Sequence, residues 1–172
     1  MTTATEAIHL HCTAQATVAS PLGPVLLART TTGLAGAWFE GQAHHPGALA
    51  APERPNDPLL RAVADQLTDY FAGRRERFEL PLDLQGTAFQ QRVWQALLRI
   101  APGRTCSYGD IAESLGAPAA VRAVGGAVGR NPVSVIVPCH RVVGRDGSMT
   151  GYAGGLDRKR ALLRLEQLAV AA

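Results

Sequence analysis

A chain of 172 residues with 47% hydrophobic content is long enough to bury a core and has the composition of a folded globular protein. No apolar run approaches the roughly 20 residues that cross a bilayer, and residues 1–6 lack the basic and then apolar layout of a secretory signal, so we expect a cytoplasmic protein without membrane contact. The net charge of +3 is unevenly divided, because residues 1–80 hold 6 Arg and 8 Asp or Glu whereas residues 81–172 hold 11 Lys or Arg and 6 Asp or Glu. A polyanionic partner would therefore bind the second half, unless the arginine surplus serves solubility alone.

The first half predicts a small sheet followed by one helix. Residues 16–27 and 33–39 have the composition of strands arranged around turns, with an obvious turn at residues 20–24. Residues 41–58 are rich in Pro, Ala and His and predict a loop. Apolar residues then recur at helical spacing from Leu59 to Phe71, and Gly73 ends this helix. Residues 74–84 predict a strand or a linker into the second half.

The second half predicts a series of helices. Thr87 and Gln90 form a candidate capping box for a helix whose apolar stripe, with core aromatics, runs from Phe89 to Leu98. Residues 107–116 and 119–129 predict two helices joined by a short turn, which is a helix-turn-helix pattern. The last predicted helix runs from residue 156 to about residue 168.

The helix predicted over residues 119–129 has almost no bulky side chains, and Arg122 is its only charged residue. Small residues let a helix backbone approach another surface closely. Tight helix packing and contact with a DNA groove are about equally compatible with this composition, and the single arginine tips the balance slightly towards the groove.

Three cysteines, Cys12, Cys106 and Cys139, make an odd number at irregular spacing. This does not suggest a disulfide framework and suits a reducing compartment, although a disulfide between two of them stays open. The residues that could in principle bind a metal form no Cys-x-x-Cys or His-x-x-x-His pair, so we expect a solvated tail and loop and no metal at these positions, which are His9, His11, Cys12, His44 and His45.

The segment around Cys139 is the most informative part of the chain. A β-branched run over residues 133–137 predicts a buried strand or extended segment, and Pro138 ends it just before Cys139. A reacting cysteine needs a nearby proton acceptor or positive field, and His140 and Arg141 are candidates. The alternative is a cysteine that is simply a small buried hydrophobe beside a locally bonded histidine.

The residues on either side of this segment favour a reactive cysteine over a purely structural one. The run Pro-Cys-His-Arg-Val-Val at residues 138–143, with Asn-Pro at 131–132 and Gly-Tyr-Ala-Gly-Gly at 151–155, closely resembles the active-site region of the O6-alkylguanine-DNA alkyltransferases. The match runs without gaps from about Thr87 to Glu166. It implies an α/β fold in the mixed α+β sense, with a ribonuclease-H-like N-terminal α/β domain over residues 1–80 and a mostly helical C-terminal domain over residues 81–172.

The resemblance implies a DNA repair enzyme of single turnover, a methylated-DNA–protein-cysteine methyltransferase. Cys139 would take the alkyl group of O6-alkylguanine, and by extension of O4-alkylthymine, and keep it as a thioether. His140 would accept the thiol proton through water, Glu166 would orient the imidazole, and Asn131 would tie backbone groups across a hinge. Judged by sequence alone, Glu166 would be a solvated helix residue and Asn131 a helix C-cap.

The resemblance also implies a minor-groove helix that flips the target base, with Arg122 filling the gap and Tyr108 rotating the phosphate and bonding the flipped purine. Without the resemblance, Tyr108 could equally be a buried aromatic at a helix start, and residues 151–155 could be an ordinary turn. The implied DNA-binding residues are Tyr108, Arg122, Ala123, Gly125 and Arg130, and the implied substrate-binding residues are Tyr108, Val142, Tyr152, Ala153, Gly154 and Lys159. The family often has Ser at position 153, so alanine there predicts altered substrate preference.

The expected partner is double-stranded DNA carrying O6-alkylguanine, bound by a monomer without a cofactor, with cooperativity on DNA left open. A non-catalytic sensor of alkylated DNA that recruits other repair factors is the main alternative, although such a protein should lack the cysteine. A transcription regulator would need a further domain. A cysteine hydrolase is weaker still, because nothing suggests an oxyanion hole.

Overall fold

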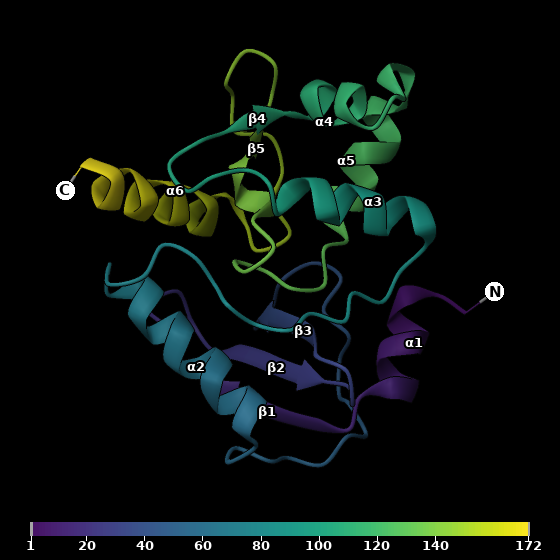
Figure 1. Ribbon diagram of the computed structural model, residues 1–172, viewed down its shortest axis with the longest axis vertical. Coiled ribbons are helices and arrows are strands. Elements are labelled where there is room, and N and C mark those ends of the chain that lie inside the picture. The colour runs from purple at the N-terminus through teal and green to yellow at the C-terminus, as the bar shows by residue number, and fades with distance from the viewer. Residues whose placement is uncertain (1, 172) are drawn as a thin grey trace. The chain divides into compact units, whose positions relative to one another are not determined.

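A computed structural model describes residues 2–171 of the chain, with side chains as far as Gln167. The chain divides into two compact units: the first comprises residues up to Gly86 together with Pro132–Ser134, and the second comprises Thr87–Asn131 and the chain from Val135 onwards. The first unit carries the main sheet and the second carries most of the helices (Figure 1). The predicted mixed α/β class, with a small sheet domain followed by a helical domain, is confirmed.

The first unit is built on a three-stranded antiparallel sheet in the order β1-β2-β3, with bounds Ala14–Val18, Val25–Arg29 and Leu34–Phe39. The predicted turn at residues 20–24 separates β1 from β2, so the strands expected within residues 16–27 and 33–39 are present. Helix α2 (Pro58–Phe71) lies along β1 and β2 and buries one apolar stripe (Figure 1). The segment Pro132–Ser134 extends this sheet, since the Ala37 N–H donates to the Pro132 carbonyl at 2.9 Å and the Ser134 N–H donates to the Ala37 carbonyl at 2.9 Å.

The N-terminal segment differs from the prediction. A solvated tail was expected around His9 and His11, but helix α1 (Ala4–His11) occupies these residues. Thr3 and Glu6 form a capping box at its start, and Ile8 is buried. The prediction was wrong because a single turn of apolar burial is too short to give a clear helical period, whereas the Thr-x-x-Glu capping box was present in the sequence and went unused.

The second unit is a cluster of helices with a two-stranded parallel pair, β4 (Cys106–Ser107) and β5 (Val142–Val143). The helix-turn-helix is confirmed as α4 (Tyr108–Ser114) followed by the 3-10 turn η1 (Pro118–Ala120) and α5 (Val121–Gly129). Helix α3 (Ala88–Leu97) packs against both α4 and α5, and its capping box of Thr87 and Gln90 is present as predicted. The unit is completed by the 3-10 helix η2 (Cys139–Arg141) and by α6 (Leu156–Ala171).

Trp94 anchors α3 to α5. Its indole is buried, and the Nε1–H donates to the Ala127 carbonyl at 2.8 Å. Of the predicted stripe, Leu98 is instead 37% exposed, because it follows the last helical residue as the C-cap and no longer keeps the helical spacing.

The predicted strand at residues 133–137 is absent. Val133 makes one isolated bridge with Ala37, and the rest of the segment forms turns. Val135 has φ of 71°, a left-handed conformation that is costly for a β-branched residue. The run is apolar because it is buried, and a short buried run predicts a strand whether or not a partner strand exists.

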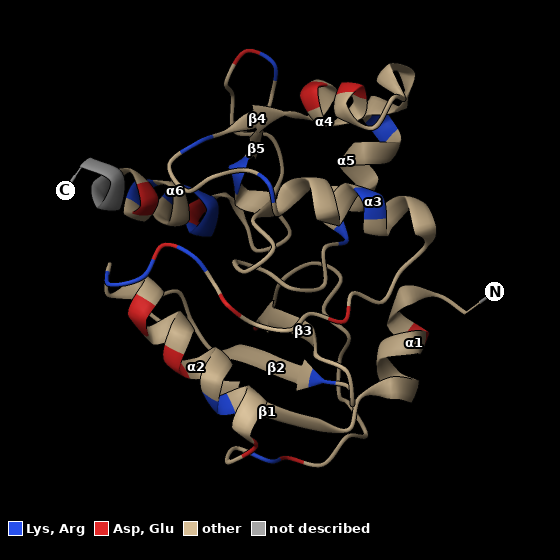
Figure 2. Cartoon of the chain, viewed as in Figure 1, with Lys and Arg blue, Asp and Glu red and all other residues tan. Residues whose placement is uncertain are grey.

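The charges of the second unit are grouped by element. Arg122 is the only charged residue within α5, whereas α6 carries both signs (Figure 2). Among the helices of residues 2–171, none combines the length and apolar character that a membrane span requires.

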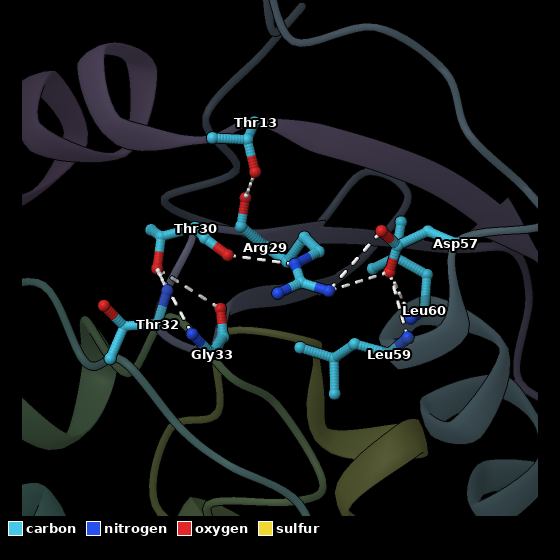
Figure 3. A network of polar contacts seen from close by, with 8 residues as sticks. All are labelled: Thr13, Arg29, Thr30, Thr32, Gly33, Asp57, Leu59 and Leu60. Atoms are coloured by element: carbon cyan, nitrogen blue, oxygen red, sulfur yellow. Dashed lines mark hydrogen bonds and ion pairs between the residues drawn. The ribbon is translucent and has the colours of Figure 1, made fainter.

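The start of α2 generates a test of stability. Asp57 accepts hydrogen bonds from the Leu59 and Leu60 N–H groups at 3.0 and 3.1 Å and pairs with the Arg29 guanidinium of β2 at 3.1 Å (Figure 3). We expect Asp57→Ala to lower the free energy of unfolding by about 0.5–2 kcal/mol, the usual cost of a lost N-cap. Asp65→Ala, at an exposed position of the same helix, should cost less than about 0.5 kcal/mol.

The same variant has a predictable pH dependence. Burial tends to raise the pKa of Asp57, but bonds from the Leu60 N–H and from Arg29 outweigh it and lower the pKa. A depressed carboxyl pKa stabilises the fold above the pKa of the unfolded chain, about 3.9, and this stabilisation is lost as pH falls below it. Urea denaturation should therefore show a smaller wild-type advantage over Asp57→Ala at pH 3 than at pH 7. An unchanged difference would contradict the lowered pKa of Asp57.

Candidate active site

The Cys139 thiol lies at the start of η2 and is held by the side chain of Asn131. The Asn131 amide Nδ2 donates to the Cys139 Sγ at 3.1 Å and to the Val137 carbonyl at 2.8 Å. Asn131 is buried and follows Arg130, which is the residue that caps α5. The plain interpretation of Asn131 as a helix C-cap was therefore wrong, and its amide instead links the thiol to the backbone before Pro138.

Burial controls the protonation of this thiol. Cys139 is 4% exposed, and its desolvation raises the thiol pKa to about 11 against the opposing effects of the Asn131 hydrogen bond and the Lys159 charge. At neutral pH the empty protein therefore holds a thiol and not a thiolate. Since the thiolate is the nucleophile, a reaction at this sulfur requires a base that takes the proton when the substrate arrives.

His140 is the candidate base. Its ring is fully buried, and Nε2 lies 2.7 Å from the Glu166 Oε1. A carboxylate at this distance is an acceptor, so Nε2 carries the proton, an assignment made from the hydrogen-bond geometry. Among the described residues, none forms a hydrogen bond with Nδ1, which leaves that nitrogen with a free lone pair.

Glu166 of α6 is buried and ionised. Burial alone would raise its pKa, but the hydrogen bonds from His140 and Arg141 outweigh burial and lower the pKa to about 2. The pKa of His140 is also lowered, mainly by burial and against the pull of Glu166. At neutral pH the pair is therefore a carboxylate and a neutral imidazole, and the expectation that Glu166 is solvated was wrong.

Lys159 of α6 joins the two sides of the candidate substrate loop. Its fully buried amine donates to the carbonyls of Val142, Thr150 and Gly151 at 2.6, 3.0 and 3.2 Å. Burial lowers the pKa of this amine, an effect that Cys139 opposes. The amine thereby fixes β5 to the loop that precedes Tyr152.

The loop over residues 151–155 is shaped by close packing. A Cβ at Gly154 would lie 2.6 Å from a ring carbon of Tyr152, so only glycine lets the tyrosine ring lie there. The Arg158 Nη1 donates to the Gly154 carbonyl at 3.1 Å. Tyr152, Ala153 and Gly154 are half-buried, so this segment is more constrained than an ordinary exposed turn.

The residues predicted to contact DNA lie on α4 and α5. Tyr108 is half-buried, and its hydroxyl is 3.5 Å from the Thr150 carbonyl. Gly125 lies against the Tyr108 ring, since a Cβ there would be 3.8 Å from it. Arg122, Ala123 and Arg130 are exposed, and none of them is hydrogen-bonded to the buried thiol network.

The structure thus joins the predicted catalytic residues in two contacts, Asn131 with Cys139 and His140 with Glu166, which meet at consecutive residues of η2, and it leaves the predicted DNA-binding arginines on the surface. Sequence reasoning missed the place of Arg141, whose guanidinium bonds the Glu166 carboxylate and not the thiol. The only signal for it was its position next to His140. Cys12 and Cys106 are free thiols outside the network, and within the described residues no three His, Cys, Asp or Glu side chains are grouped to hold a metal.

Comparison with known proteins identifies relatives over most of the chain. Residues 14–84 match the family model of the 6-O-methylguanine DNA methyltransferase ribonuclease-like domain, and residues 88–168 match that of the DNA binding domain of the same family. A methylated-DNA–protein-cysteine methyltransferase of Mycobacterium leprae is 50% identical over 159 residues, covering 92% of this chain and 93% of the relative. One from Methanosarcina barkeri is 47% identical, covering 87% and 94%.

Solved structures agree with these relatives. The crystal structure of Mycobacterium tuberculosis O6-methylguanine methyltransferase matches with a TM-score of 0.82 at 48% identity, covering 90% of this chain and 93% of that one. A structure of the Mycobacterium tuberculosis protein in complex with DNA also matches with a TM-score of 0.82 at 48% identity, covering 91% and 94%.

The Asn131 amide generates a second test. We expect Asn131→Ala to raise the pKa of Cys139 further, because the hydrogen bond to sulfur is lost, and to destabilise the fold by about 1–3 kcal/mol, because two buried hydrogen bonds of the amide are lost together. Thiolate absorbance against pH, in a protein with Cys12 and Cys106 replaced by serine, measures the first effect. Gln95→Ala, an exposed amide on α3, is the matched control. A thiol pKa that does not rise would remove Asn131 from this role.

Proposed function

Because this chain belongs to the 6-O-methylguanine DNA methyltransferase family, we propose that it repairs DNA by direct reversal, with Cys139 as the acceptor of the alkyl group. The observation that carries this proposal is the buried thiol with an amide donor on its sulfur and an adjacent neutral imidazole backed by a carboxylate. The proposed base and orienting group are in contact, and we propose that a water joins this base to the nucleophile, as the activation of a thiol requires.

The proposed reaction is a single displacement. The Cys139 sulfur attacks the alkyl carbon, the S–C bond forms, the bond from that carbon to O6 breaks, and guanine leaves with the electron pair. The thiol proton passes through a water to Nδ1 of His140 and finally neutralises the departing guanine. The product is a thioether that no group in the described chain can cleave, so each molecule reacts once.

The burial of the thiol supports base flipping. Cys139 is 4% exposed, so a base stacked inside a duplex cannot reach it and must rotate out of the helix into the protein. The exposed α5 residues Arg122 and Ala123, with half-buried Gly125, provide a small-residue surface with one guanidinium. Arg122 would occupy the place of the flipped base, and exposed Arg130 would bind phosphate.

The proposed purine pocket is lined by backbone as much as by side chains. The Val142 carbonyl accepts from Lys159 at 2.6 Å and has a second lone pair for the guanine amino group. Tyr108 would donate its hydroxyl proton to the purine, and Tyr152 would form a wall. Ala153 provides its N–H but no hydroxyl, so we expect a substrate preference that differs from that of relatives with serine.

The sensor alternative is not favoured. The relatives at about 50% identity are methyltransferases, and Cys139 lies in the complete setting that alkyl transfer needs. We propose that the protein acts as a monomer on double-stranded DNA in the cytoplasm. Three free cysteines, one of them needed as a thiol, are consistent with a reducing compartment.

Intact-protein mass spectrometry tests the proposal directly. After incubation with a duplex containing O6-methylguanine, we expect the mass to rise by a single methyl group, with no further rise on longer incubation. Cys139→Ala should gain nothing. Tight binding of the damaged duplex with an unchanged mass would instead support the sensor alternative.

A variant of Arg122 distinguishes base flipping from the alkyl-transfer reaction. Arg122→Ala should slow repair of O6-methylguanine in a duplex by at least about tenfold, a loss on the order of 1.4 kcal/mol, while transfer from free O6-benzylguanine stays near the wild-type rate. Free base needs no flipping, so only the first reaction depends on the arginine. Equal losses in both assays would exclude the flipping role.

A further inference from the structure

We propose that Arg141 is the positioning residue that keeps His140 a neutral proton acceptor, acting through its ion pair with Glu166. This inference rests on the proposed function, because it concerns the proton that the Cys139 thiol must lose. Arg141 itself is directed away from the sulfur, since its three nitrogens all donate elsewhere.

The Arg141 guanidinium makes a bidentate contact with the carboxylate. Nε donates to the Glu166 Oε2 at 3.0 Å, and Nη2 donates to Oε1 at 2.8 Å. The third nitrogen, Nη1, donates to the Ile100 carbonyl at 2.5 Å, in the turn that follows α3. Arg141 is 6% exposed and Glu166 is 3% exposed, so water screens this pair little.

Arg141 affects the protonation of His140 because both side chains donate to the same oxygen of Glu166. Oε1 accepts from both Arg141 Nη2 and His140 Nε2, at 2.8 and 2.7 Å. The positive charge of the Arg141 guanidinium therefore balances the negative charge of the Glu166 carboxylate while the imidazole is still neutral. Without Arg141, the buried carboxylate would favour a second proton on His140 or a proton of its own.

The charged groups around His140 support the same conclusion. Glu166 and Lys159 face it from α6, Arg141 follows it in the chain, and the Cys139 thiol precedes it. With His140 neutral, the Arg141–Glu166–His140 group has no net charge, and Nδ1 stays available for the thiol proton. A second proton on the ring would occupy Nδ1 and remove the acceptor.

A purely structural role is the competing explanation, because Arg141 also joins the turn at Ile100 to α6. The two roles differ in what a lysine can replace. Arg141→Lys keeps the positive charge but cannot form the bidentate contact, whereas Arg141→Met removes both. The loss of a nearby positive charge stabilises the doubly protonated state of the Cys139–His140 pair, which cannot react.

The test is the pH dependence of single-turnover methyl transfer from an O6-methylguanine duplex. We expect the acidic limb of the rate profile to move to higher pH by about one pH unit or more in Arg141→Met, and to stay near its wild-type position in Arg141→Lys even if the plateau rate falls. Arg104→Met, which removes an exposed arginine of the same unit, should leave the profile unchanged. Equal plateau losses in both Arg141 variants with unmoved limbs would overturn the proposal and leave only the structural role.

Ring nitrogen chemical shifts of His140, assigned through His140→Gln, provide a readout independent of alkyl transfer. The wild-type protein at neutral pH should show a neutral ring with the proton on Nε2, and Arg141→Met should show protonation of both nitrogens at a higher pH than the wild type does. A wild-type ring that is charged, or protonated on Nδ1, would overturn the inference even if Arg141→Met failed to fold. Absence of methyl transfer combined with the expected shifts would refute the proposed function alone.

Discussion

The buried carboxylate of Glu166 is the constraint around which the catalytic part of the second unit is arranged. An ionised carboxylate at 3% exposure is tolerated only when its oxygens are bonded, and here His140 and Arg141 donate to it from consecutive positions of η2. Lys159 lies seven residues before Glu166, two helical turns away on the same side of α6, and bonds the Val142 carbonyl just beyond η2. One helix face thus fixes the segment 139–142 by two separate polar contacts.

The segment before the thiol depends on side-chain bonding because it lacks a strand ladder. Pro138 has no N–H, and Val135 is in the left-handed region, so the chain from Val135 to Cys139 cannot pair regularly. The Asn131 amide replaces that pairing with bonds to the Val137 carbonyl and to the sulfur. The same two bonds that stabilise the turn therefore also fix the nucleophile, which couples the local fold to the chemistry.

Elements of the fold and the site could be predicted from the sequence where they depend on residues close together in the chain. Helices α2, α3, α4 and α5 followed from local patterns, namely apolar spacing, capping residues and stop signals, and each was predicted within a few residues. The strand at 133–137 failed because burial without pairing has the same composition as a buried strand. Glu166 is separated from His140 by 26 residues in sequence, so no local pattern could place it beside the base, and only the family resemblance did. Arg141 was named as a possible positive field for the thiol, but its true partner could be found only once α6 was in position.

A thiol whose pKa is raised to about 11 is a poor nucleophile at neutral pH. Burial raises the pKa of Cys12 and of Cys106 to about 11 as well, so protonation alone does not distinguish Cys139. What distinguishes it is the amide that donates to its sulfur and the buried imidazole of the next residue, which we propose as the acceptor of the thiol proton. A protein that can react only once gains from this arrangement, because a resting thiolate would be consumed by any oxidant or electrophile. We infer that such a buried thiol, with a base beside it in the chain, reacts only when a substrate enters the site.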